Sequence, residues 1–386
     1  MLFQIDSPEM NSFRHEVRTW LEINLKKEWR NQLHCIDPFI LRQWQVKLYE
    51  RGWVAPQWPK SEGGMGATLD QQLILLEEQA RIGAPYLFPT GINLLGPTLI
   101  AFGTDEQKKR FLQPLLSAKE VWAQGYSETE AGSDLASLKT SASIEGDSFI
   151  VNGHKIWSSY AHLADWLFAI VRTDPKANQK QAGLSMLLID LKSQGVSVSS
   201  IRTIAGHDEF AQIYLENVKV PIQNLLGPLH GGWKVANHIL VSERLSNGSP
   251  RNLWIVWQKI VKVAKQTGTW NEPIYRDRVA QLEIRFMTHL ACYRQAVQAV
   301  KSKQSIDMLA PVLKISATEL LQDFNSLLLE VAGNKGAQQV FEFEDGTSID
   351  LIPSRLLARR SSIYGGSNEI QRNIIATRVL GMPKSW

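Results

Sequence analysis

The sequence predicts an α+β fold in which a helical segment, a β segment and a second helical segment follow one another. Helical spacing of apolar residues fills the first 120 residues and returns from Gly231 to the end. Between these segments, short runs of β-branched and aromatic residues alternate with turn signals. The chain has 386 residues, 44% of them hydrophobic, which is enough for two or three domains with sizeable cores.

Residues 1–120 are predicted to form an all-helical domain. Four helices are expected to begin at capping signals, at Ser7-Pro8, Asp37-Pro38, Thr68 with Gln71, and Thr104 with Gln107. Gly52 to Gly66 is rich in glycine and proline, so we expect a loop there. Ile82 to Thr104 has no charged residue, but its three prolines and four glycines argue against a membrane span. We expect a buried loop and helix there, which could form one wall of an apolar ligand tunnel.

Residues 121–227 are predicted to form an antiparallel β domain, and residues 228–386 a helical domain. The expected strands contain Phe149 to Val151, Trp166 to Val171, Ser185 to Ile189, Val196 to Ile201 and Gln212 to Val220. Two apolar helix faces are expected after them, one with Leu282, Phe286, Leu290 and Tyr293 and one with Val312, Ile315, Leu320 and Phe324. Pro250 should break a helix about two turns after Glu243.

Composition and missing motifs exclude several classes of function. The net charge of +4 is spread along the chain, which argues against a nucleic-acid partner. The two cysteines form no CxxC and the eight histidines show no paired ligand spacing, so no metal site is predicted. The GxGxxG, P-loop, HExxH and GxSxG signatures are absent. The first ten residues include Asp6 and Glu9 and do not resemble a secretory leader, so we expect a reduced, cytoplasmic enzyme.

Glu243 is the most unusual charged residue in the pattern, because it continues an apolar helical stripe that includes Ala236 and Ile239. A carboxylate on an inward face is costly unless it is paired or used in chemistry. Burial would raise its pKa toward that of a useful general base. An ion pair with Arg244 or Arg251 is the structural alternative, and the residues alone leave both interpretations open.

Two long motifs, Gln124 to Asp174 and Tyr364 to Pro383, resemble the acyl-CoA dehydrogenase family, and the resemblance covers essentially the whole chain. The family implies a helical N-terminal domain, a central β domain and a C-terminal four-helix bundle. It also implies FAD bound between domains and between subunits. The expected assembly is a homotetramer or a homodimer, with a heterotetramer as the alternative.

In the first motif, the resemblance implies that Tyr126 and Ser127 contact the flavin and that Ser133 contacts both the cofactor and the CoA arm. A polar turn between strands is the alternative interpretation of this segment. The resemblance further implies that Trp157 packs on the flavin and that Ser159 hydrogen-bonds its N5 atom. For a single tryptophan taken alone, ordinary core packing would be the simpler interpretation.

In the second motif, many family members have the catalytic glutamate at the position of Gly365, which has no side chain to accept a proton. A branch of the family has the base on the earlier helix, where this chain has Glu243, so Glu243 is the predicted base. By resemblance, the N–H of Gly365 would polarise the thioester carbonyl. Arg244 and Gly366 are predicted to bind substrate.

Ser367 and Glu369 match positions near the adenosine half of FAD, although Ser367 also has the pattern of a helix N-cap. Two segments depart from the family pattern. Thr129-Glu130 replaces the usual Pro-Gly of the first motif. Glu330 and Asn334 stand where much of the family has a glutamine and a glycine that contact FAD from a neighbouring subunit.

The predicted reaction is FAD-dependent α,β-dehydrogenation of an acyl-CoA to the trans-2-enoyl-CoA, as in the β-oxidation of fatty acids and other lipids. Glu243 would remove the α-proton while flavin N5 accepts a hydride from the β-carbon. An electron-transferring flavoprotein would then accept the electrons. Two alternatives remain open. One is an oxygen-using flavoenzyme of the same fold, either an acyl-CoA oxidase or a monooxygenase, and the other is a non-catalytic subunit of a heteromeric acyl-CoA dehydrogenase.

Overall fold

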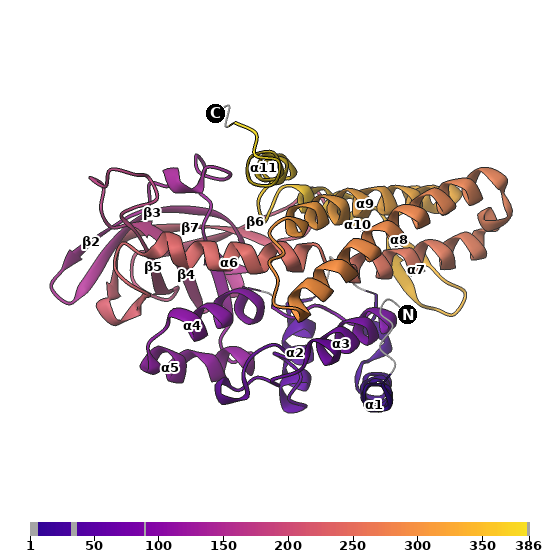
Figure 1. Cartoon of the computed structure of the whole chain (residues 1–386), viewed down its shortest axis with the longest axis horizontal. Coiled ribbons are helices and arrows are strands. Elements are labelled where there is room, and N and C mark those ends of the chain that lie inside the picture. Colours follow the sequence, from indigo (N-terminus) through magenta and orange to yellow (C-terminus); the bar gives the residue numbers. More distant parts are fainter. Residues whose placement is uncertain (1–6, 32–36, 89, 384–386) are drawn as a thin grey trace. The chain divides into compact units, whose positions relative to one another are not determined.

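The computed structural model describes residues 7–31, 37–88 and 90–383, and the side chains of residues 240–247 lie outside this description. The chain forms two compact units, each described here by itself. The helical unit comprises Met1–Leu41, Ala67–Tyr86 and Arg244–Trp386. The sheet unit comprises Arg42–Gly66 and Leu87–Glu243. The α+β class predicted from the sequence is confirmed, with helices at both ends of the chain and strands in the middle (Figure 1).

Four of the N-terminal helices in the described ranges begin at the predicted capping signals, and the fifth, α4, follows a π-helical turn instead. The helices are α1 (Pro8–Asn24), α2 (Pro38–Glu50), α3 (Leu69–Ile82), α4 (Gly96–Phe102) and α5 (Asp105–Leu116). The Ser7 side chain accepts a hydrogen bond from the backbone N–H of Met10, and Thr68 and Thr104 both form complete capping boxes. Local sequence therefore determines where these helices start.

The long uncharged stretch forms a buried turn and helix, as predicted. Thr90–Leu95 is a π-helix that leads directly into α4, and Leu95 and Leu99 are fully buried. The indole N–H of Trp58 donates to the carbonyl of Ile92 at 3.2 Å, so the preceding loop closes over this turn. Within the described ranges, no helix is both long enough and apolar enough to cross a membrane.

The sheet unit is built on one sheet whose strands follow the order β6-β7-β3-β2-β4-β5-β8, with β1 paired to β4. The strands are β1 (Trp122–Gly125), β2 (Ser141–Glu145), β3 (Ser148–Ser159), β4 (Trp166–Arg172), β5 (Leu184–Asp190), β6 (Val196–Ile201), β7 (Phe210–Pro221) and β8 (Leu225–Leu226). All five predicted runs lie in strands. The longest ladder pairs β3 with β7, and Val151, Ile213 and Val218 are fully buried on it.

Two pairings differ from the antiparallel prediction. The strand β1 runs parallel to β4 with Trp122 opposite Trp166, and β2 meets β4 in a short parallel pairing of Ser141 with Arg172. The chain between β1 and β4 includes the β2–β3 hairpin, which is long enough for the crossover that a parallel pair requires. The two indoles stack with their centroids 5.3 Å apart. The remaining long ladders are antiparallel.

The helical unit packs α7 (Arg251–Thr267), α8 (Pro273–Lys301) and α9 (Leu309–Val331) around one apolar core, which also includes Leu73 and Ala80 of α3 (Figure 1). The predicted face of Phe286, Leu290 and Tyr293 is buried in this core. Val312 is 40% exposed, so its placement in the second face is wrong. The buried stripe instead runs through Ala310, Leu313, Ala317 and Leu320.

Three features of the helical part bear on the candidate site. The helix α6 (Gly232–Asn247) ends before Pro250, and α7 starts at Arg251, so the predicted break is confirmed. The C-terminal part contains β9 (Val340–Glu342), β10 (Ser348–Asp350), α10 (Ile352–Leu357) and α11 (Asn368–Ile374). A π-helical turn, Ile375–Val379, follows α11 directly.

Candidate functional site

The end of β1 places Tyr126 and Ser127 against the neighbouring strands. The Tyr126 ring is buried and meets the ring of Phe168 edge to face, with centroids 6.1 Å apart. The carbonyl of Ser127 accepts a hydrogen bond from the backbone N–H of Ile156 at 2.9 Å. The two segments of the first motif, around Ser127 and around Ile156, are therefore directly connected.

The segment after Ser127 is a tight turn whose tip is exposed. Glu128 and Ala131 exchange two backbone hydrogen bonds, at 3.0 and 3.2 Å. Glu130 forms an exposed ion pair with Lys139, and Ser133 is exposed beyond the turn. Thr129-Glu130 therefore occupies a solvent-facing turn, where a Pro-Gly pair is not needed to satisfy the backbone.

Trp157 is not a core residue in this chain, because its side chain is 56% exposed. It lies at a register shift of the β3–β7 ladder, with a φ of 62°, and its ring meets Phe210 edge to face at 6.0 Å. Such a bulge re-aims a side chain out of the pleat. The next residue, Ser158, has a buried hydroxyl that no described residue hydrogen-bonds, and Ser159 is half-buried.

These observations fit a site for a planar aromatic cofactor. A large exposed indole held at a positive φ is unfavourable unless something covers it. Ser127 and Ser159 are both half-buried, and the buried Ser158 hydroxyl has no partner in the described part of the chain. The residues thus offer an apolar face and several hydrogen-bonding groups, which is the combination that a flavin ring requires.

The second motif forms a glycine turn before α11. Gly365 and Gly366 have φ values of 62° and 79°, which other residues rarely adopt. No described residue accepts a hydrogen bond from either of their N–H groups. The Ser367 side chain caps α11 by accepting from the N–H of Ile370 at 3.3 Å. The N–H groups of Gly365 and Gly366 could therefore donate hydrogen bonds to an electron-rich ligand atom.

A buried polar cluster holds this turn. Gln371 is fully buried and donates from Nε2 to the carbonyl oxygens of Gly365 and Gly366, at 3.3 and 3.2 Å. Asn368, the first residue of α11, accepts at Oδ1 from the fully buried Lys314 at 2.9 Å. Sequence reasoning missed both interactions, because a glutamine and a lysine in helices are ordinarily surface residues.

Glu369 lies on the exposed side of α11. Its own backbone N–H and the Ser367 side chain hold the pKa of the Glu369 carboxyl below its ordinary value. A carboxylate in the first turn of a helix is favoured by the helix dipole. The capping interpretation of Ser367 is thus confirmed, while the contact of Ser367 and Glu369 with a nucleotide stays a prediction.

Glu243 and Arg244 both lie in α6, but their side chains are outside the described ones. The predicted stripe leading to them is confirmed as far as it is described, because Ala236 and Ile239 are fully buried. Arg251 donates to the carbonyl of Ala84 at 2.5 Å, and its guanidinium lies 4.2 Å from the centroid of the Tyr86 ring.

Two side chains of α8 hydrogen-bond the segment between α6 and α7. Nε2 of His289 lies 3.1 Å from the carbonyl oxygen of Gly248, and Tyr293 hydrogen-bonds Ser249. Burial lowers the pKa of His289 to about 4, although the Gly248 carbonyl opposes this shift. Burial raises the pKa of Tyr293 to about 12, and the hydrogen bond with Ser249 opposes it. Both residues are thus neutral at pH 7 and fix the backbone five to six residues after Glu243.

The predicted site residues divide between the two units. Tyr126, Ser127, Ser133, Trp157 and Ser159 belong to the sheet unit, together with Glu243. Arg244 and the turn from Gly365 to Glu369 belong to the helical unit. In the helical unit, Glu330 forms an ion pair with Arg278, so its charge is already compensated by a neighbouring cation.

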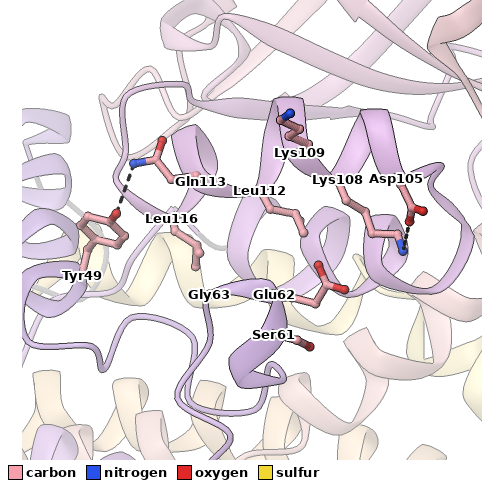
Figure 2. Close-up of a pocket in the computed structure, with 10 residues that line it drawn as sticks. All are labelled: Tyr49, Ser61, Glu62, Gly63, Asp105, Lys108, Lys109, Leu112, Gln113 and Leu116. Atoms are coloured by element: carbon pink, nitrogen blue, oxygen red, sulfur yellow. Dashed lines mark hydrogen bonds and ion pairs between the residues drawn. The ribbon is translucent and has the colours of Figure 1, made fainter.

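One open pocket of the sheet unit lies elsewhere and includes none of the predicted site residues. It has a volume of about 450 Å³ and lies between the loop after α2 and the helix α5. Figure 2 shows Tyr49 hydrogen-bonded to Gln113 at one end of the pocket and Lys108 paired with Asp105 at the other. Its lining is mixed in charge, and among the described residues no group of three or more potential metal ligands occurs.

Comparison with known proteins gives the same family over the whole length. Three consecutive ranges match domains of one family: residues 7–119 match "Acyl-CoA dehydrogenase, N-terminal domain", residues 123–218 the middle domain and residues 230–380 the C-terminal domain. These ranges follow the order of the predicted domains, whose cuts near residues 120 and 228 stay a prediction.

Individual relatives and solved structures agree. The acyl-CoA dehydrogenase IpdE1 of Mycobacterium tuberculosis is 35% identical, and the match covers 97% of this chain and 98% of that protein. A solved structure described as "Tcur3481-Tcur3483 steroid ACAD" has a TM-score of 0.88 at 30% identity, covering 99% of both chains. The ChsE4-ChsE5 complex from Mycobacterium tuberculosis has a TM-score of 0.82 at 28% identity, covering 99% of this chain and 100% of that one.

The fold, the two motifs and these matches agree with one another. Members of this family are oxidoreductases and are generally FAD-dependent. The chain therefore belongs to the acyl-CoA dehydrogenase family.

Proposed function

We propose that this enzyme catalyses FAD-dependent α,β-dehydrogenation of an acyl-CoA thioester to the trans-2-enoyl-CoA. The observation that supports it most is the exposed indole of Trp157, which the bulge in β3 turns out of the sheet beside Ser159. An apolar face of this size in a family member is expected to be covered by the cofactor ring.

Bound FAD would supply the hydride acceptor for the β-carbon of the substrate. In the sheet unit, Tyr126, Ser127, Trp157 and Ser159 would hold its ring, with Ser133 beyond the turn. In the helical unit, Ser367 and Glu369 would face its adenosine half. The indole offers a stacking surface, and the serine hydroxyls offer hydrogen bonds to polar edges of the ring.

The chain's own residues would perform the proton chemistry. Glu243 would remove the α-proton, since Gly365 has no side chain for this step. The N–H groups of Gly365 and Gly366 have no acceptor among the described residues, so they could donate to the thioester carbonyl as negative charge develops on its oxygen. Arg244 would bind the substrate near the base. Exclusion of water would raise the pKa of Glu243 toward that of an effective base.

The substrate is proposed to be a bulky, steroid-derived acyl-CoA rather than a short linear one. The proposal is supported by a structural relative, 30% identical to this chain, that is described as a steroid ACAD. Another relative was solved as a complex of two different chains, which supports a heteromer as the alternative to a homotetramer or homodimer. An electron-transferring flavoprotein is the proposed electron acceptor.

A flavin-bleaching assay tests the proposed function. The purified chain is expected to be yellow, and its flavin absorbance near the visible maximum should bleach when a steroid-derived acyl-CoA is added without oxygen. Glu243→Gln should retain FAD and lose bleaching, whereas Asp323→Asn, which removes an exposed ion pair with Arg285, should bleach normally. Bleaching by Glu243→Gln would contradict the assignment of the base.

The same assay separates the two alternatives. Peroxide formation that matches substrate consumption in air would identify an oxygen-using enzyme. A colourless chain that gains FAD only when mixed with a second, related chain would identify a subunit of a heteromer. Bleaching by a short linear acyl-CoA but not by steroid-derived ones would contradict the proposed substrate class.

A further inference from the structure

A fully buried lysine lies at the centre of the first motif. The side chain of Lys155, on β3, is 0% exposed. Its Nζ donates to Oε1 of Glu128 at 2.8 Å, to the carbonyl of Ile170 at 2.8 Å and to the carbonyl of Tyr126 at 3.2 Å. Three donors thus meet three acceptors, which satisfies the whole ammonium group inside the protein.

Glu128 is equally well satisfied. Besides Lys155, its carboxylate accepts from the backbone N–H of Lys139 at 2.6 Å and from that of Thr140 at 2.9 Å. Burial raises the pKa of Glu128, but Lys155 and these hydrogen bonds outweigh it and lower the pKa. Burial lowers the pKa of Lys155 to about 8 against the opposing charge of Glu128. The pair is therefore charged on both sides at pH 7.

The position of this pair in the sheet is specific. Glu128 follows Ser127 directly, and Lys155 precedes Trp157 by two residues, at the start of the register shift in β3. Between them, the N–H of Ile156 donates to the carbonyl of Ser127. The ion pair therefore connects the two segments that would contact the flavin, and it lies behind both of them.

Stability alone does not account for such a pair. Replacing a buried ion pair by apolar residues of similar volume is often neutral or stabilising, because the desolvation cost of the two charges disappears. A pair of apolar side chains, however, cannot hold the neighbouring carbonyl groups in fixed directions. Only the ammonium group fixes the carbonyls of Tyr126 and Ile170 at set distances and thereby fixes the exit of β1 relative to β3.

We propose that Lys155 and Glu128 are positioning residues that hold Tyr126–Ser127 and Trp157–Ser159 at the spacing that the flavin ring requires. This inference rests on the proposed function, because it assumes that these four residues bind FAD. It extends that function to two residues that lie behind the ring and do not touch it.

The test compares FAD binding by stripped protein in the double variant Lys155→Met/Glu128→Gln and in wild type. The neutral pair should raise the FAD dissociation constant about tenfold or more, because a displacement of a fraction of an ångström is costly in a preorganised site. The flavin absorption spectrum and reduction potential of reloaded protein should also shift. The melting temperature of the FAD-free protein should change by only a few degrees.

A matched control is the exposed pair Lys139 and Glu130, whose side chains are 76% and 70% exposed. Lys139→Gln keeps the backbone N–H that Glu128 accepts from, and it should leave FAD binding within about twofold of wild type. Glu128→Asp provides a second variant, because it keeps the charge but shortens the reach to Lys155. It should bind FAD with intermediate affinity, and it decides the question if the double variant does not fold.

The outcomes are distinguishable. If wild type binds no FAD, the proposed function fails and this inference fails with it. If wild type binds FAD but the double variant and Glu128→Asp bind it equally well with an unchanged spectrum, only the positioning role is overturned. A loss of FAD affinity that merely follows a collapse of the FAD-free melting temperature in both variants would also overturn it, since it would reflect folding alone.

Discussion

Gln371 donates from its buried side-chain amide to the carbonyl oxygen of Gly365 at 3.3 Å. The same nitrogen donates to the carbonyl of Gly366 at 3.2 Å. Because the two carbonyls are held from inside the protein, the peptide planes of the turn cannot rotate freely. The carbonyl of Gly365 shares its peptide plane with the N–H of Gly366, so the buried amide of Gln371 sets the direction of one of the two N–H groups proposed to meet the thioester.

Gln371→Glu should slow flavin reduction while FAD stays bound. The carboxylate cannot donate to the two carbonyls and repels them, so the turn would lose its fixed orientation. A loss of about 1.4 kcal/mol of transition-state stabilisation corresponds to a tenfold lower rate. Single-turnover bleaching measures the rate, and Arg372→Gln, a change at a neighbouring exposed residue, is the control. An unchanged rate in Gln371→Glu would show that the turn does not depend on this amide.

Gly96→Ala should destabilise the sheet unit by about 1–3 kcal/mol. A Cβ added at Gly96 would lie 1.8 Å from Cζ2 of the buried Trp58, so the indole or the helix must move. Gly132→Ala is the matched control, because no atom lies within 4 Å of its added Cβ. Thermal unfolding of both variants measures the difference. Equal melting temperatures would mean that Trp58 relocates at no cost.

His289 should make the protein less stable as the pH falls from about 6.5 toward 4. Its pKa is about 4 in the folded protein and near 6.5 in the unfolded chain, so only the unfolded chain gains a proton in this interval. The contribution is fully present above pH 6.5, and between pH 6.5 and pH 5 roughly 1–2 kcal/mol of it is lost.

The partners of His289 define its neutral form. The Gly248 carbonyl can only accept, so Nε2 bears the hydrogen and Nδ1 accepts from the Ser316 hydroxyl, 3.2 Å away. Chemical unfolding of wild type and His289→Gln at pH 7 and pH 5 tests whether His289 is the group whose titration lowers the stability. The variant should lose part of the pH dependence, and identical slopes would show that His289 is not the responsible group.

Glu78→Gln should destabilise the helical unit by roughly 3 kcal/mol, because it leaves the buried Arg14 without its full compensation. Burial raises the pKa of Glu78, but hydrogen bonds from Arg18, Arg81 and Arg14 lower it to about 2. This contribution is present above pH 4.5 and is lost as the pH falls toward 2. Glu22→Gln, which removes only an exposed partner of Arg81, should cost less than about 1 kcal/mol. Urea unfolding compares the two.

Features that depend on a few neighbouring residues were predictable from the sequence. The capping boxes at Thr68 and Thr104 and the helix break at Pro250 are such cases, because each follows from local backbone geometry. The strand runs were predictable for the same reason. The parallel pairing of β1 with β4 was not, because nothing in either strand states which neighbour it will have.

The same distinction between local and tertiary features applies to the candidate site. The motifs identified which serines and glycines to consider, but they did not reveal that Trp157 is exposed, since this depends on a bulge in a ladder with β7. The pairing of Lys155 with Glu128 was equally hidden, because the two residues are 27 positions apart and meet only in the folded sheet. The sequence shows how many charged residues the chain has, whereas the tertiary structure decides which of them pair.

The discontinuous helical unit has a consequence for synthesis. Leu73 and Ala80 of α3 share a core with Leu253 and Ile260 of α7, which the ribosome makes much later. At about 5–20 residues per second, α3 is complete roughly 9–36 s before this partner is synthesised. The nascent chain therefore exposes the apolar face of α3 while the sheet unit is still being translated, and transcripts cut short after Glu243 should yield aggregation-prone products that depend on chaperones.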